Sequence, residues 1–566
     1  MRIVAGNSQS FALVLPDTIG FLAGFKDLRR DLLKASAIHV LAYLGSGSFS
    51  SLSGEVVRPL FLVGDSSAPT SHMRGLDVSH VAEIGERVRS LISQPMATVS
   101  VAAVLAESDA PFRAHADFGL RLIRDVARST EGLSTGDDAR YRRKYWEVSS
   151  LEGLKRIQGP PRSSHDRDGL SGLEDVVLWD VPNHSLGEDL GARLRGATAW
   201  GNSGLLIGRI GRISAGPYLG ALFDKSCVAL VPRRPDVIPA LRAFLDSGEF
   251  ELGLRRIDRK VAVATKSIEK VPFDEERWRA VAIDDIPSPE SWSNNPMQWL
   301  FRGRPEDSLA PLQVATCRLL GIHWPEQPDS DELDAFTDND GIVCIPVVAA
   351  EARAADRVQP LLAAAYGDTW SPAKLKELLE QAGGTRRNLA DWLRDEFFKQ
   401  HCALFGNRPF VWHIWDGVKD GFSALLNYHM LDRKSLAKLT YSYLGQDWVE
   451  RQRSEVRDEV AGAEARLAAA LDLKVKLELI LDGEQPHDIY VRWKEKHEQP
   501  IGWEPDLNDG VRLNIRPFVT AGVLRYNPNI KWGKDRGKNP DGSERMNDVH
   551  LSLAEKADAR KRAGRT

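Results

Sequence analysis

Continuous apolar runs and one segment of helical spacing alternate in the N-terminal part of the chain. Residues 11–16 read FALVLP, and further apolar runs occupy residues 38–44 and 56–63. Such runs are typical of strands buried on both faces. Residues 21–34 carry apolar side chains at helical spacing. The pattern therefore predicts strand, helix, strand and strand at the edge of an α/β sheet.

Between residues 131 and 274 the apolar runs become shorter, and Gly, Pro and Ser interrupt them. Residues 200–213 and 223–232 are examples, and Arg or Lys stands near the ends of both. This texture predicts β-rich structure with basic loops. Basic loops on a β scaffold suit a nucleic acid.

The pattern of apolar and polar residues changes again after residue 274. Residues 284–290, DDIPSPE, read as a linker-like break, and from residue 347 onwards the spacing is helical. Residues 448–481 predict a long helix pair, in which Leu467, Leu471 and Val475 are spaced for burial. The charged residues of this pair predict a solvated face.

The composition of the chain is compatible with several domains but does not by itself indicate a binding partner. The chain has 566 residues, of which 42% are hydrophobic and 27% charged, and its formal net charge is −4. A chain of this length is expected to build more than one core. The four cysteines have no metal-ligand spacing, and no apolar run is long enough to cross a membrane. We therefore expect a cytoplasmic protein without a membrane partner.

Basic residues gather locally despite the negative total. Residues 193–274 hold fourteen Lys and Arg against eight Asp and Glu. Residues 140–146, RYRRKYW, interleave basic and aromatic side chains, which suits phosphate contacts with stacking; an equally good alternative is a strand edge whose Tyr and Trp pack inward. The candidate DNA-binding residues are Arg140, Arg142, Arg143, Lys144, Arg209, Arg212, Lys260, Lys266, Lys534 and Arg536.

These candidates divide by the contact that each is expected to make. Arg209 and Arg212 are candidates for base readout, because arginine is the usual bidentate partner of guanine in the major groove, while a solvated or phosphate-facing position is the alternative. Lys260 and Lys266 are expected to contact phosphate. Residues 531–538, KWGKDRGK, predict either a phosphate clamp or a solvated tail.

His413, Asp416 and His429 are a further group of polar side chains worth testing. They lie in an aromatic-rich stretch with no nucleophile motif beside them. We therefore expect a structural polar cluster rather than a hydrolytic site.

Five segments resemble adenine-specific DNA methyltransferases of the large type IIG, BREX-like and DISARM-like kinds. The turn at residues 132–141, GLSTGDDARY, is similar to the "G-x-T-G-D-N-x-x-F" turn that opens their target-recognition domain, and residues 264–273 are similar to the stretch that closes it. Asp138 stands where Asn is usual, and Tyr141 where Phe is usual. Residues 11–63 look like the last strands of their catalytic domain, and residues 408–429 and 493–518 look like their C-terminal segments.

The resemblance implies S-adenosylmethionine as the cofactor of the assembled enzyme, with no cofactor-binding or catalytic residue assigned to this chain. Family members need a Gly-rich cofactor turn and a D/N/S-P-P-aromatic loop that holds a flipped adenine. The nearest candidates here are residues 44–49, LGSGSF, and residues 294–299, NNPMQW. The first is predicted to be a connecting loop and the second an ordinary proline turn. We expect the catalytic residues on a separate polypeptide or on the missing part of a longer gene product.

The predicted organisation follows from these patterns and the resemblance together. Residues 1–116 would be an α/β remnant of a methyltransferase sheet, 117–275 a β-rich target-recognition domain, 276–346 a linker region, 347–485 a mainly α-helical region, and 486–566 a C-terminal segment with a basic tail. The predicted function is target recognition on double-stranded DNA, with an N-terminal methyltransferase half or other restriction or defence subunits as partners. The alternatives are a stand-alone DNA-specificity subunit and a defence-complex scaffold without catalysis.

Overall fold

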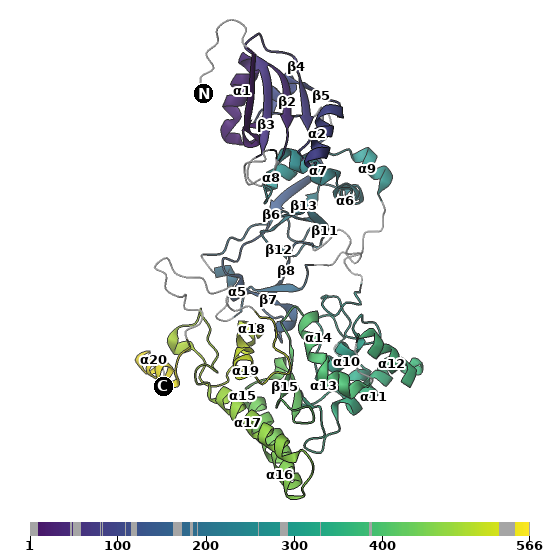
Figure 1. Ribbon diagram of the computed structural model, residues 1–566, viewed down its shortest axis with the longest axis vertical. Coiled ribbons are helices and arrows are strands. Elements are labelled where there is room, and N and C mark those ends of the chain that lie inside the picture. The colour runs from purple at the N-terminus through teal and green to yellow at the C-terminus, as the bar shows by residue number, and fades with distance from the viewer. Residues whose placement is uncertain are drawn as a thin grey trace. The chain divides into compact units, whose positions relative to one another are not determined.

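The structure is a computed structural model with mixed α/β architecture (Figure 1). It describes residues 10–45, 48, 58–79, 81, 83–107, 109–114, 121–161, 172–181, 185–188, 191–258, 260–282, 292–328, 330–383, 388–530 and 550–564. The chain divides into two compact units. Unit 1 holds residues 1–130, 203–215 and 228–286, and unit 2 holds residues 131–202, 216–227 and 287–566. Residues 117–275, expected to be one recognition domain, therefore contribute to both units.

The N-terminal sheet of unit 1 confirms the predicted order of strand, helix, strand and strand. Its strands lie in the order β1-β3-β2-β4-β5; β1 and β2 each pair antiparallel with β3, and β2 pairs parallel with β4. Leu60 and Leu62 of β3 are buried against Leu33 and Leu41, while Phe61 on the other face is exposed. The elements are β1 (Ser10–Pro16), α1 (Lys26–Ala35), β2 (Ala37–Tyr43), β3 (Pro59–Asp65), β4 (His72–Asp77), α2 (Ile84–Ser93), β5 (Ala97–Ser100) and α3 (Val101–Ala106).

A second sheet, most of whose residues belong to unit 1, has the order β11-β10-β13-β6. Strand β10 is buried along its whole length, as the run of apolar residues predicts, and Leu205 and Ile207 pack with Leu241 and Phe244 of α6 in one core. The elements are α4 (Ile123–Val126), β6 (Ala127–Glu131), β10 (Gly204–Gly208), β11 (Ser214–Tyr218), β13 (Cys227–Pro232), α6 (Ile238–Asp246), α7 (Glu249–Ile257), α8 (Thr265–Ile268) and α9 (Glu275–Val281).

Unit 2 begins with a small sheet in the order β12-β8-β9-β7. Strands β7 and β8 both pair antiparallel with β9, so that Arg142 lies opposite Val177. The elements are α5 (Asp138–Tyr141), β7 (Arg142–Lys144), β8 (Leu154–Gln158), β9 (Asp175–Leu178) and β12 (Leu222–Phe223).

The remainder of unit 2 is mainly helical, as expected, but it surrounds an antiparallel sheet, β14-β16-β15, that the helical pattern did not predict. Trp412 of this sheet stacks on Tyr428 and meets Phe518 edge to face in the largest core. The elements are α10 (Pro311–Leu319), β14 (Ile342–Cys344), α11 (Ala354–Tyr366), α12 (Pro372–Gln381), α13 (Leu389–Asp395), α14 (Phe397–Leu404), β15 (Val411–Trp415), β16 (Ser423–Asn427), α15 (Arg433–Ala437), the π-helix η9 (Lys438–Val449), α16 (Glu450–Arg457), α17 (Ala463–Asp482), α18 (Val511–Asn514), α19 (Arg516–Ala521) and α20 (Leu553–Arg562).

Two expectations need correction. Residues 276–346, expected to be a linker region, contain helix α10, which is buried at every position; a helix buried all round lacks the polar face that helical periodicity detects. The predicted helix pair is present as α16 and α17, but the burial expected of Leu471 and Val475 is wrong, because these side chains are 37% and 56% exposed. The face of α17 that packs inward carries Leu473 and Leu477 instead.

Candidate nucleic-acid interface

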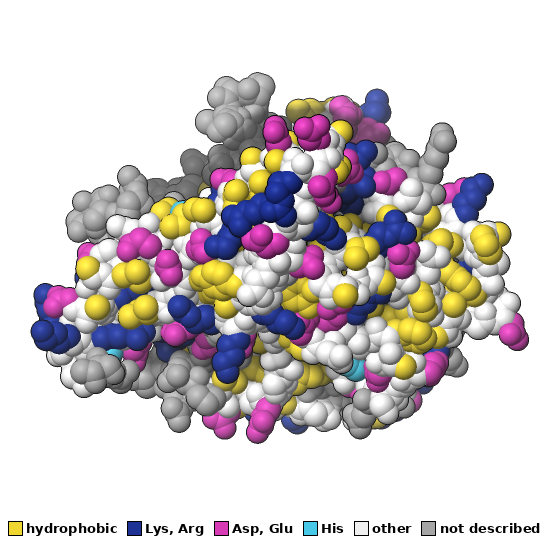
Figure 2. All heavy atoms as spheres, turned by 90° about the horizontal axis from the view of Figure 1, so that it is seen from below, with side chains coloured by type: hydrophobic (Ala, Val, Ile, Leu, Met, Phe, Trp, Pro, Cys, Tyr) yellow, Lys and Arg dark blue, Asp and Glu magenta, His cyan; other side chains and the backbone are white. Residues whose placement is uncertain are grey.

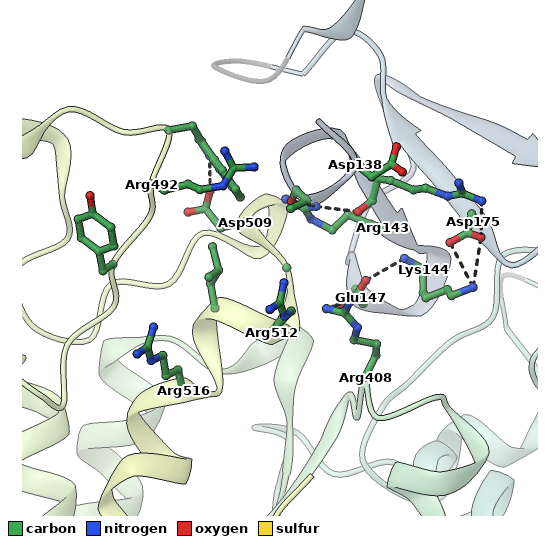
Figure 3. Close-up of a pocket in the computed structure, with 16 residues that line it drawn as sticks. Asp138, Arg143, Lys144, Glu147, Asp175, Arg408, Arg492, Asp509, Arg512 and Arg516 are labelled. Atoms are coloured by element: carbon green, nitrogen blue, oxygen red, sulfur yellow. Dashed lines mark hydrogen bonds and ion pairs between the residues drawn. The ribbon is translucent and has the colours of Figure 1, made fainter. Parts of the chain in front are cut away.

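A basic pocket of 290 Å³ lies in unit 2, where the segment around α5 and β7 meets the C-terminal segment (Figure 3). The basic side chains in its lining outnumber the acidic ones. The basic ones are Arg142, Arg143, Lys144, Arg408, Arg492, Arg512 and Arg516, and the acidic ones are Asp138, Glu147, Asp175 and Asp509. We call this cavity with these residues the basic pocket. On the face of the molecule in Figure 2, by contrast, basic and acidic side chains are interspersed.

The segment at residues 138–146 forms one wall of the pocket, and its aromatic residues point into the core. Asp137 caps the single turn of α5 by accepting a hydrogen bond from the Arg140 backbone N–H at 3.2 Å. Tyr141, Tyr145 and Trp146 are all buried. The structure therefore shows inward packing, one of the two alternatives for the aromatic side chains of this segment. Its basic side chains at the pocket are Arg142, Arg143 and Lys144, whereas the predicted Arg140 is not part of the lining.

Arg142 and Lys144 are held by carboxylates at the pocket wall. Arg142 donates to Asp175 at 2.9 Å and to Asp224 at 3.0 Å, and Lys144 donates to Asp175 at 3.2 Å. Burial works to lower the pKa of Arg142, but the two carboxylates outweigh it and raise that pKa above its ordinary value. These two cations are therefore largely neutralised within the protein.

Arg143 joins the two sides of the pocket. Its guanidinium is 4% exposed and donates to the backbone carbonyl of Asn508 at 2.8 Å. On the other side it donates to the carbonyls of Ala139 at 2.8 Å, Arg142 at 2.7 Å and Arg140 at 3.1 Å. Burial lowers the pKa of Arg143. The Arg143 side chain therefore links the segment at residues 139–142 to the loop that contains Asn508, and we assign it a positioning role in the pocket.

Gly510 makes this approach of the two loops possible. Its φ is +89°, a conformation that favours glycine, and a Cβ atom there would lie 2.8 Å from Nε of Arg143. Any larger residue would displace the guanidinium or the loop.

Four arginines that sequence reasoning missed complete the pocket. They are Arg408, Arg492, Arg512 and Arg516. Burial and the nearby charges of Arg408, Arg516 and Arg492 together lower the pKa of Arg512 to about 10, against a partial offset from Glu147. Because burial is the largest cause, the depressed pKa reflects mainly the cost of removing the guanidinium group from water, and repulsion from the neighbouring arginines adds to it.

The acidic side chains of the pocket also make contacts other than those with its arginines. Glu147 lies 3.6 Å from Arg408 and also accepts the backbone N–H of Lys144 at 2.8 Å. Asp509 accepts from Lys494 at 2.5 Å, and Arg492 pairs with Asp137. In Figure 3, Arg408 and Arg512 extend from different segments toward the same part of the cavity. The arrangement is suited to binding an anion through guanidinium groups.

The remaining predicted residues lie in unit 1 or outside the described residues. The backbone of Arg209 accepts a hydrogen bond from Val263, and the carbonyl of Lys260 accepts one from Arg255, so the loops at 209–212 and 260–263 lie together. Arg212 and Lys260 are exposed. Lys266 is also exposed and pairs with Glu269 at 2.9 Å. Lys534 and Arg536 lie outside the described residues. DNA contact by any of these residues stays a prediction.

The described parts of the candidate cofactor turn at residues 44–49 and of the candidate catalytic loop at residues 294–299 pack against other parts of the protein. A Cβ atom on Gly45 would lie 2.7 Å from the backbone oxygen of Ser79, so protein fills the space beside this glycine. Asn295 accepts the backbone N–H of Met297 at 2.9 Å, and the carbonyl of Pro296 accepts the Tyr145 hydroxyl at 2.8 Å. Residues 46, 47 and 49 of the first candidate lie outside the described residues. That this segment is a connecting loop stays a prediction, and we derive no step of methyl transfer from either segment.

His413, Asp416 and His429 each have a different local environment. His413 is fully buried, and burial lowers its pKa to about 3. Asp416 accepts the backbone N–H groups of Val418 at 3.0 Å and Phe422 at 2.7 Å, and His429 donates to the carbonyl of Trp146 at 2.8 Å. They support turns and packing separately. Within the described ranges no group of three or more His, Cys, Asp and Glu side chains is placed to hold a metal ion.

Comparison with known proteins gives partial matches. Over 196 residues the chain is 25% identical to the adenine-specific methyltransferase PglX of Lacticaseibacillus casei (strain Zhang); the match covers 33% of this chain and 16% of that protein. A solved structure of the type IIL restriction-modification enzyme MmeI in complex with DNA matches with a TM-score of 0.28 and 11% sequence identity, over 66% of this chain and 49% of that chain. No protein-family model matches. The similarity to PglX supports the resemblance to adenine-specific methyltransferases found in the sequence.

The part of the chain that the structure describes contains no helix long and apolar enough to cross a membrane.

Proposed function

We propose that this chain recognises double-stranded DNA as part of an adenine-specific, S-adenosylmethionine-dependent DNA methyltransferase of a restriction-modification or phage-defence system. The similarity to PglX and the basic pocket of unit 2 support this proposal. The pocket would bind the phosphate backbone and hold the chain in register, while base readout would come from Arg209 and Arg212 on the loops of unit 1.

The observation that carries the proposal is the convergence of Arg408, Arg512 and Arg516 on the lining of one cavity. Burial, followed by repulsion from the neighbouring arginines, lowers the pKa of Arg512 to about 10, so the guanidinium group stays charged at neutral pH but is held there at a cost. A phosphate group bound among Arg408, Arg512 and Arg516 would offset that repulsion and accept several charge-assisted hydrogen bonds. Binding would release counterions from the DNA, which makes it strongly dependent on salt.

The two loops that Arg143 joins define the shape of the pocket. Arg142 and Lys144 are neutralised by carboxylates, so in this proposal they stiffen the wall rather than bind DNA. This refines the roles expected of residues 140–144: the cationic groups of the C-terminal segment make the phosphate contacts, and Arg143 positions them.

Methyl transfer would take place on a partner methyltransferase half that binds S-adenosylmethionine and the flipped adenine. The alternative is a stand-alone DNA-specificity subunit or a scaffold without catalysis.

The test is fluorescence-anisotropy binding of the purified chain to a mixed-sequence duplex over a salt series, with transfer of tritiated methyl groups measured in the same tubes. We expect binding that weakens steeply with salt, with no transfer until a methyltransferase half is added. Transfer by the chain alone would contradict the assignment of catalysis to a partner. Absence of DNA binding at low salt would contradict the recognition role itself.

A further inference from the structure

Helix α17 has apolar side chains on its outward face. Leu471, Val475 and Leu479 are 37%, 56% and 38% exposed, although they lie in a 20-residue helix of unit 2. Residues four apart lie on the same side of an α-helix, so these side chains form one stripe about 12 Å long. We call them the α17 stripe.

The α17 stripe cannot be buried by rotation of its own helix. Leu473, Leu477 and Ile480 on the opposite side are fully or almost fully buried in the core of unit 2. The helix is therefore apolar on both sides, a pattern typical of helices that are covered on both sides. A single exposed apolar residue needs no explanation, whereas an aligned set on one face marks a contact surface.

The charges beside the stripe indicate which partner would cover it. On one flank Asp472 pairs with Lys476 at 2.7 Å, and on the other Lys474 pairs with Glu478 at a similar distance of 2.5 Å. Each flank thus carries one acidic and one basic residue, and the order of the two charges along the helix is opposite on the two flanks.

We propose that a second copy of this chain covers the α17 stripe, with the two α17 helices antiparallel about a twofold axis at Val475. In that arrangement Leu471 of each copy faces Leu479 of the other, and Val475 faces its own counterpart. Each flank meets the same flank of the other copy in reverse order. With a rise of about 1.5 Å per residue, Asp472 then lies within about 3 Å, along the axis, of Lys476 of the other copy.

The same operation brings Lys474 beside Glu478 of the other copy, so opposite charges meet on both flanks. A self-complementary surface of this kind is what a twofold interface requires. A parallel pair would also bring opposite charges together on the flanks. It would, however, place Glu464 and Asp482, both exposed on the stripe side, against their own counterparts. The antiparallel pair places Asp482 beside Ala468 instead, which favours the antiparallel arrangement.

Disulfide crosslinking of variants of the full chain that each carry one added cysteine tests the geometry. The described natural cysteines, Cys227, Cys317, Cys344 and Cys402, are all buried and will not interfere. Under mild oxidation we expect Val475→Cys to crosslink with itself, and a mixture of Leu471→Cys with Leu479→Cys to crosslink, while each of these two alone does not exceed the control. Ile92→Cys, at 84% exposed on α2 of unit 1, is the matched control. Self-crosslinking of Leu471→Cys and Leu479→Cys would overturn the antiparallel pairing.

Sedimentation over about a hundredfold range of protein concentration tests the association itself, since an interface of this size is expected to be weak. The chain should shift from its monomer mass of 62.8 kDa toward twice that value. Val475→Glu should remain monomeric at the highest concentration, because it places two carboxylates against each other, while Ile92→Glu should behave like the unchanged chain. Both sites are exposed, so both variants should fold. A monomer at every concentration, or a dimer that survives Val475→Glu, would overturn the proposal.

Discussion

Replacing Arg143 by Met is the sharpest test of how the basic pocket is built. The guanidinium donates four hydrogen bonds to carbonyls, one of them in the loop at residues 506–510 and three in the segment at 139–142. Methionine fills a similar volume but donates nothing. The substitution therefore removes the link between the two loops while keeping most of the packing.

The expected cost follows from those bonds. Hydrogen bonds to a charged group contribute about 1.5–3 kcal/mol each, so four of them give an upper bound of about 6–12 kcal/mol. Two effects reduce that value: the burial that lowers the pKa of Arg143 is itself unfavourable to the charge, and water can reach some of the released carbonyls. We expect a loss of about 3–5 kcal/mol in the free energy of unfolding of unit 2. Arg143→Lys should recover only part, because an ammonium group cannot span both loops.

Urea unfolding gives the magnitude, and hydrogen exchange of peptides covering residues 138–147 and 506–516 locates it. Exchange in both peptides should accelerate together in Arg143→Met, because the side chain connects them. Arg353→Met, at a residue 58% exposed and paired with Asp356, is the control and should change stability by less than about 0.5 kcal/mol. Unchanged stability and exchange in Arg143→Met would refute the assigned positioning role and return Arg143 to the candidates for direct DNA contact.

Three further predictions follow from particular residues. Gly510→Ala should destabilise unit 2 by about 1–3 kcal/mol in urea unfolding, because its positive φ and the neighbouring guanidinium leave no room for Cβ. Lys556→Met should cost about 3–5 kcal/mol, since it removes a buried cation 3.2 Å from Asp488 and leaves that buried carboxylate with His550 as its charged partner. Burial works to raise the pKa of Asp488, but hydrogen bonding from His550 and the charge of Lys556 outweigh it and lower that pKa; this stabilisation is therefore present above about pH 4 and is lost as the pH falls further, which acid unfolding would show. Arg209→Ala and Arg212→Ala should each weaken specific DNA binding by about 1–3 kcal/mol if the residue reads a base, whereas equal losses on all sequences would identify a phosphate contact.

The sequence predicted secondary structure correctly where a continuous apolar run or regular helical spacing marked the element. The runs at 11–16 and 38–44 correspond closely to β1 and β2, and the helix pair at 448–481 is present as α16 and α17. Helix α10 was missed because every one of its side chains is buried, so that no polar face marks its period. Local pattern could not show the burial of Leu473 in place of Leu471, because almost every position in that part of α17 is apolar or charged.

The residues of the basic pocket could likewise be predicted from the sequence only where they lie close together along the chain. Residues 142–144 could be found because three consecutive cations stand out in the sequence. Arg408, Arg492 and Arg512 are separated by long stretches of chain, and only tertiary structure brings them to one cavity. The spacing of Arg512 and Arg516, four residues apart, was the one local signal that could have placed two of them together.

The most direct test of the proposed DNA recognition is the salt dependence of duplex binding by the chain with Arg408, Arg512 and Arg516 all changed to Ala. Each phosphate contact contributes about 0.9 to the slope of the logarithm of the binding constant against the logarithm of salt concentration. The triple variant should therefore lose about 2–3 units of slope on every sequence, while Arg353→Ala keeps the full slope. An unchanged slope in the triple variant would show that the basic pocket does not bind the DNA backbone.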